Sequence, residues 1–141
     1  MGVAAVAMAA CGAPKGAVEF ATLHNYFYRN DAPEEARLLK LTSRAAFERN
    51  FGEAAVMGTD GEPTQVDFDK CFVIACVLPE THVATEIQRV DLHRAPGRRL
   101  VMDYAVVRGE RHDYVTRPTI QIAVSRRYAD YTVTLRKHND R

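Results

Sequence analysis

The sequence predicts an α+β domain that is mainly β, built as an antiparallel twisted sheet, a sandwich or a partly closed barrel of about six to seven strands, with one short helix near residues 44–51. The first observation behind this prediction is a series of strand-like segments in the second half of the chain. They cover residues 71–78, 83–93, 99–107, 118–126 and 130–136. The second is that the links between these segments are only a few residues long, which favours hairpins over crossover helices.

Alternating side chains indicate antiparallel strands with one face in water. In the segment 99–107, every second residue from Leu100 to Val106 shares one face, and the other face carries Asp103. The segment 83–93 changes its alternation near Gln88 and Arg89, which predicts a β-bulge there.

The first half of the chain is predicted in less detail. Residues 23–28 are aromatic-rich and suit a first strand. Residues 31–41 form either a helix capped by Asp31 or a loop that leads into a short strand, and we favour the second. Ser43 is a good helix cap, and the short helix after it is predicted to end at Gly52.

The N-terminus resembles the end of a bacterial lipoprotein signal, because the small apolar residues 3–10 lead directly to Cys11. We therefore expect a signal remnant at 1–10, a flexible tether at 11–19 and a single globular domain at 20–137. Lipidation of Cys11 would place the protein in the cell envelope, held to the membrane by lipid alone. The alternative is a disordered terminus with an incidental cysteine, since no basic residue precedes the apolar run.

Composition excludes several classes of protein. The chain has 141 residues and a net charge of +1, with 7 Lys+Arg against 11 Asp+Glu in residues 1–81 and 12 against 7 in residues 82–141. The basic residues alternate with strand residues and do not cluster with aromatic ones, so we expect no nucleic-acid partner. No apolar run after Cys11 has the length of a membrane-spanning helix.

No pattern of residues predicts catalysis, a metal site or a cofactor. Cys71 and Cys76 fall about 16 Å apart on opposite faces of one buried strand, so they cannot form a disulfide. The five histidines lack metal-site spacing. An enzyme would require at least two of His82, His93 and His112 to converge with an acid, and we predict that the protein is not an enzyme.

The candidate binding surface is the polar segment 108–118, which is predicted to be a long loop between strands. Its contact residues would be Arg111, His112, Tyr114 and Arg117, because Tyr and Arg are the residues that most often anchor interfaces. The alternative is a plain solvated loop.

A second hypothesis for function is a small apolar ligand or lipid bound inside a curved sheet. Its cavity would be lined by Phe72, Met102 and Tyr104. A packed interior is the simpler expectation for those side chains.

The order of elements resembles the C-terminal domain of PrcB-type bacterial lipoproteins over about residues 20–137. The likeness rests on the aromatic first strand, the Ser-capped helix, the segment 66–70 running into the buried strand 72–75, and the late Arg117 and Pro118. It implies an accessory role beside an exported or cell-surface protease, hence an envelope or exported protein partner. The chain departs from the family at residues 78–81, where the Gly-rich turn is missing.

Overall fold

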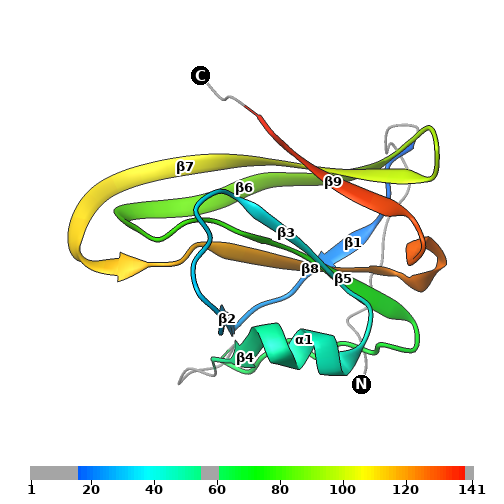
Figure 1. The fold of residues 1–141 in the computed structure, drawn as a ribbon, viewed down its shortest axis with the longest axis horizontal. Helices are drawn as coiled ribbons and strands as arrows, with labels where there is room; N and C mark the ends of the chain where they lie inside the picture. Colours follow the sequence, from blue (N-terminus) through cyan, green and yellow to red (C-terminus); the bar gives the residue numbers. More distant parts are fainter. Residues whose placement is uncertain (1–15, 55–60, 139–141) are drawn as a thin grey trace.

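The structure is a computed structural model that describes residues 16–54 and 61–138. Figure 1 shows three layers. The strands are β1 (Phe20–Thr22), β2 (Tyr26–Tyr28), β3 (Arg37–Leu41), β4 (Phe51–Glu53), β5 (Cys71–Val77), β6 (Thr81–Ala95), β7 (Arg99–Thr116), β8 (Thr119–Ser125) and β9 (Thr132–Lys137), and the helical elements are α1 (Arg44–Asn50) and the 3-10 turn η1 (Arg126–Tyr128). The upper sheet has the order β6-β7-β9, the middle sheet β1-β8-β5-β3, and the lowest layer holds α1 and the β2-β4 pair. The mainly β, α+β prediction is confirmed, and the described strands do not close into a barrel.

Strand β5 is covered on both faces and lies at the centre of the molecule. All seven of its residues are buried. Phe72, Ile74 and Cys76 face the upper sheet, and the alternate residues face α1 and the β2-β4 pair. This double burial explains the continuous apolar run, which a strand with one wet face would not need. Cys71 and Cys76 are free and buried in different clusters, as their spacing predicts.

The long pair β6 and β7 corrects the prediction of a loop at 108–118. Residues up to Thr116 belong to β7, which pairs with β6 from the turn at Gly97 to Thr81. The pair continues directly into β5 and β8, where Val77 faces Thr119. Figure 1 shows β7 bending back toward β8, so one curved ribbon joins the two sheets. The bulge predicted near Arg89 is present, with a register shift between Gln88 and Asp91 and a positive φ of 54° at Arg89.

Strand β9 runs parallel to β7, which corrects the expectation of an antiparallel sheet at this pair. The reason is the path of the chain. Strand β8 lies in the middle sheet, so the chain reverses direction twice between β7 and β9 before it returns to the upper sheet. Arg98 in the hairpin turn holds this return, because it forms an ion pair with Asp130 and lies over the Tyr131 ring.

In the first half of the chain, some predicted elements are confirmed and others are corrected. Of the strand predicted at 23–28, only residues 26–28 form a strand, β2, because β1 ends earlier, at Thr22, and Asn25, with a φ of 69°, breaks the extended backbone before β2. Strand β3 confirms the preferred interpretation of residues 31–41. The Ser43 side chain caps α1 by accepting a hydrogen bond from the Ala46 amide at 3.1 Å. The helix ends at Asn50, and Gly52 lies in β4, where a Cβ atom would come within 2.6 Å of the Phe27 ring.

The folded part of the chain begins earlier than the tether prediction of 11–19 allows. Within that range, Gly16 accepts a hydrogen bond from the Arg94 amide at 2.9 Å, and Val18 donates one to Leu92 at 2.8 Å. Val18 is buried in the core because it extends the edge beside β6. Cys11 and the proposed signal remnant at 1–10 lie outside the described residues. Neither described helical element is long and apolar enough to span a bilayer.

Candidate functional site

The predicted contact residues fall on a wide irregularity in β7. Between the register pairs Thr81 with Thr116 and Val83 with Arg111, β6 advances by two residues and β7 by five. The three extra residues have no partner position on β6, so this part of β7 is pushed outward. We call residues 111–115 the β7 bulge.

An aromatic stack orders the β7 bulge. The His112 and Tyr114 rings lie parallel, with centroids 3.8 Å apart and an interplanar angle of 1°. His112 Nδ1 also lies 3.0 Å from the Tyr114 carbonyl, and His82 Nδ1 lies 3.3 Å from the His112 carbonyl. Tyr114 is nevertheless 63% exposed and Val115 47% exposed. The bulge therefore presents apolar surface to solvent in a fixed conformation.

Arg111 and Arg117, the two predicted cationic contacts, lie in different settings. Arg111 is exposed and precedes the stacked residues in the chain. Arg117 instead joins three segments, because its Nε donates to Glu80 Oε2 at 2.6 Å and its guanidinium donates to the Asn30 carbonyl at 3.0 Å. The structure thus brings His112 and Tyr114 together, leaves Arg111 exposed in the same bulge, and gives Arg117 contacts with two other segments.

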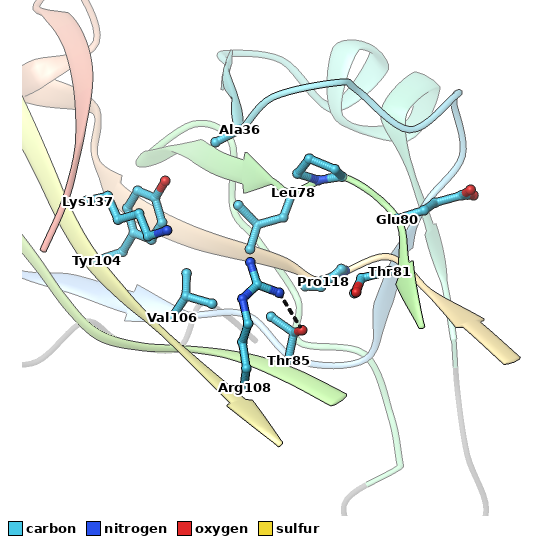
Figure 2. A pocket seen from close by; sticks show the side chains of 11 residues that line it. Ala36, Leu78, Glu80, Thr81, Thr85, Tyr104, Val106, Arg108, Pro118 and Lys137 are labelled. Atoms are coloured by element: carbon cyan, nitrogen blue, oxygen red, sulfur yellow. Dashed lines mark hydrogen bonds between the residues drawn. The ribbon is translucent and has the colours of Figure 1, made fainter. Parts of the chain in front are cut away.

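A cleft that the sequence did not predict opens where the two sheets separate, next to the curved ribbon. Its volume is about 420 Å³. Figure 2 shows Tyr104, Val106 and Arg108 of β7 along one wall, with Lys137 beside Tyr104 and Leu78 opposite. Of the three residues predicted to line a cavity, only Tyr104 reaches this cleft. Phe72 and Met102 have no exposed surface and lie in the packed core.

The alternation of β7 and β9 explains the lining of the cleft. Tyr104, Val106 and Arg108 continue the inward row that begins at Leu100, and Lys137 faces Tyr104 in the register of β9. One signal for this site was present in the sequence, since alternation places Tyr104, Val106 and Arg108 on the same face as Leu100. Burial, and then the nearby Cys76 thiol, raise the pKa of the Tyr104 phenol.

A buried carboxylate on the outer face of the upper sheet is the second feature that sequence reasoning did not single out. Asp103 is 4% exposed, and it accepts two hydrogen bonds from Arg136, at 2.5 and 3.2 Å. His93 Nδ1 and His138 Nε2 lie 3.3 and 3.6 Å from its two oxygens. The hydrogen bond and charge of Asp103 raise the pKa of the Arg136 guanidinium. Because these partners come from β6, from β9 and from the residue after β9, the cluster fixes the C-terminal strand to the sheet.

The remaining histidines and cysteines do not assemble a site in the part of the chain that the structure describes. His82 and His112 are neighbours, whereas His93 lies with Asp103 at another place on the sheet. No group of three His, Cys, Asp or Glu residues among those described has the geometry to hold a metal ion. Burial raises the pKa of Cys76 to about 12 and also raises that of Cys71.

Comparison with known proteins found no matching family model, no matching curated protein and no matching solved structure. The resemblance to PrcB-type lipoproteins therefore stays a prediction.

Proposed function

We propose that the protein is a non-enzymatic, lipid-anchored domain of the cell envelope that binds a protein partner through the β7 bulge. The observation that carries the proposal is the exposed, pre-ordered stack of His112 and Tyr114. The resemblance to PrcB-type lipoproteins, together with Cys11, supports an exported partner, including an exported protease that this domain would help to assemble.

The bulge has the properties of a binding hot spot. Tyr114 and Val115 are both exposed, and the exposed cation Arg111 belongs to the same bulge. Aromatic and Arg side chains dominate the energetics of most interfaces. The stack already fixes the Tyr114 ring, so binding requires less loss of side-chain freedom than a mobile tyrosine would need.

The surface also has a stable support. The ion pair of Arg117 with Glu80 and its hydrogen bond to Asn30 connect the end of β7 to two other segments. An ion pair of this exposure adds little to global stability. The effect of the Arg117–Glu80 ion pair is local, because it ties the end of β7 to the start of β6 beside the bulge.

Affinity capture with matched variants tests the proposal. The full chain and its Tyr114→Ala and Arg111→Ala variants are used to capture proteins from the envelope of the producing cell, with Phe27→Ala as a control. Phe27 is also an exposed aromatic residue, at 48%, but it lies in the lowest layer. A partner should be retained by the wild-type chain and the Phe27 control, and its yield should fall roughly tenfold or more with Tyr114→Ala.

The melting temperature separates loss of binding from loss of folding. Tyr114 is mostly exposed, so its replacement should change stability by less than about 0.5 kcal/mol. Equal capture by wild type and Tyr114→Ala would refute the proposed surface. Intact mass of membrane-extracted protein tests the anchor, since lipidation predicts a chain that starts at Cys11 with added acyl mass, and an unmodified chain that keeps Met1 would refute it.

A further inference from the structure

The cleft between the sheets is separate from the β7 bulge and has an unbalanced charge. Its charged lining residues are Glu80, Arg108 and Lys137. Glu80 is already bound by Arg117, which lies outside the lining. Arg108 donates to the Thr85 hydroxyl at 3.2 Å, and no described carboxylate lies within ion-pair distance of Arg108 or Lys137. Among the described residues, two cations therefore share one concave site with a single carboxylate, Glu80, which Arg117 already binds.

The Tyr104 hydroxyl adds a neutral hydrogen-bond donor to the same wall. The residue as a whole is 4% exposed, and its hydroxyl makes no hydrogen bond to another described residue. Figure 2 shows this hydroxyl directed away from the strand, on the side where the Lys137 amine lies. Because no buried side-chain oxygen or nitrogen of the described residues lacks a partner, this hydroxyl reaches the solvent of the cleft, where a ligand can accept its hydrogen bond.

The rest of the cleft is apolar. Leu78, Val106 and Pro118 line it next to the charged groups. A volume of about 420 Å³ lies within the range of small-molecule sites. Water alone would satisfy the cations, but it would leave this apolar wall wet.

We propose that the cleft binds a small amphiphilic carboxylic acid. The carboxylate accepts hydrogen bonds from Arg108, Lys137 and the Tyr104 hydroxyl, and the hydrocarbon chain lies against Leu78, Val106 and Pro118. A carboxylate matches the planar donors of a guanidinium and gains charge-assisted hydrogen bonds from both cations. This site does not depend on the protein partner proposed for the β7 bulge.

A titration of the isotope-labelled full chain tests the site. Octanoate, used below its micelle concentration, is compared with 1-octanol and octylammonium, while amide NMR signals report where each compound binds. Octanoate should give saturable shifts at Val106, Arg108 and Lys137. We expect 1-octanol to bind about tenfold more weakly and octylammonium more weakly still, because the cations favour an anion.

Variants identify the groups that hold the carboxylate. The double change Arg108→Gln and Lys137→Gln should weaken octanoate binding about tenfold or more, and Tyr104→Phe by about threefold. Arg94→Gln is the matched control, since Arg94 is an exposed arginine of β6 outside the cleft, and it should bind like wild type. Circular dichroism confirms that each variant is folded.

Three results would each overturn the proposal. They are equal affinity for octanoate and 1-octanol, octanoate affinity unchanged in the folded double variant, and the absence of saturable shifts at the cleft. The capture experiment on the β7 bulge is unaffected by all three.

Discussion

Replacing Cys76 by serine and by alanine tests the double burial of β5. Cys76 has no exposed surface, and its sulfur makes no hydrogen bond to a described residue. Serine keeps the shape of the side chain but places a hydroxyl in an apolar site, which costs about 1–3 kcal/mol when no partner is available. Alanine removes one sulfur atom and leaves a small cavity, for which we expect a cost of about 1 kcal/mol.

The order of stability is the critical result. In urea unfolding, Cys76→Ser should be less stable than Cys76→Ala by about 1 kcal/mol, although serine is closer to cysteine in size. The same site predicts slow thiol chemistry. With a pKa of about 12, roughly one thiol in 10,000 is ionised at pH 8, against about one in ten at the ordinary value of 9.0, so labelling at Cys76 should be about 1000-fold slower in the folded protein. A serine variant as stable as the alanine variant, or rapid native labelling of Cys76, would refute the packing described for β5.

Three further predictions concern the cap, the C-terminal strand and alkaline pH. Ser43→Ala removes the cap of α1 and should cost about 1 kcal/mol in urea unfolding, whereas Ser43→Asp should cost little; equal losses would show that the cap does not matter. Asp103→Asn removes the charge that holds Arg136, so amide exchange should accelerate in β9 more than in β8, and uniform exchange in both strands would contradict this. The folded pKa of Cys76 lies above the unfolded value of 9.0, so its stabilising effect is complete below pH 9 and is lost as pH rises toward 12. The unfolding free energy of wild type should therefore fall more steeply above pH 9 than that of Cys76→Ala, and parallel curves would refute the assignment.

Elements whose signals are local in the sequence were predictable. The continuous apolar run of β5 and the Ser43 cap of α1 depend on neighbours within a few residues, and both predictions are confirmed. The direction of β9 was not predictable in this way. It depends on which sheet holds β8, and no short window of sequence contains that information.

The last part of β7, residues 108–116, was predicted as a loop for a different reason. Residues 108–116 are largely exposed and contain the β7 bulge, so they carry no regular alternation of apolar side chains. They are held by pairing with β6 rather than by burial. Two of the predicted contact residues, His112 and Tyr114, do lie together, although they belong to a strand and not to the predicted loop. The cleft could not be predicted because its lining comes from five separate segments of the chain, which only the fold brings together.

Site-specific crosslinking in living cells tests the proposed function most directly. A photo-reactive phenylalanine analogue is placed at position 114 of the full chain, and at position 27 in a control. Tyr114 and Phe27 are both exposed aromatic residues, but they lie in different layers. The proposal predicts one defined covalent adduct with an envelope protein from position 114 and none from position 27. Adducts from position 27 alone, or from neither position, would contradict a partner that binds at the β7 bulge.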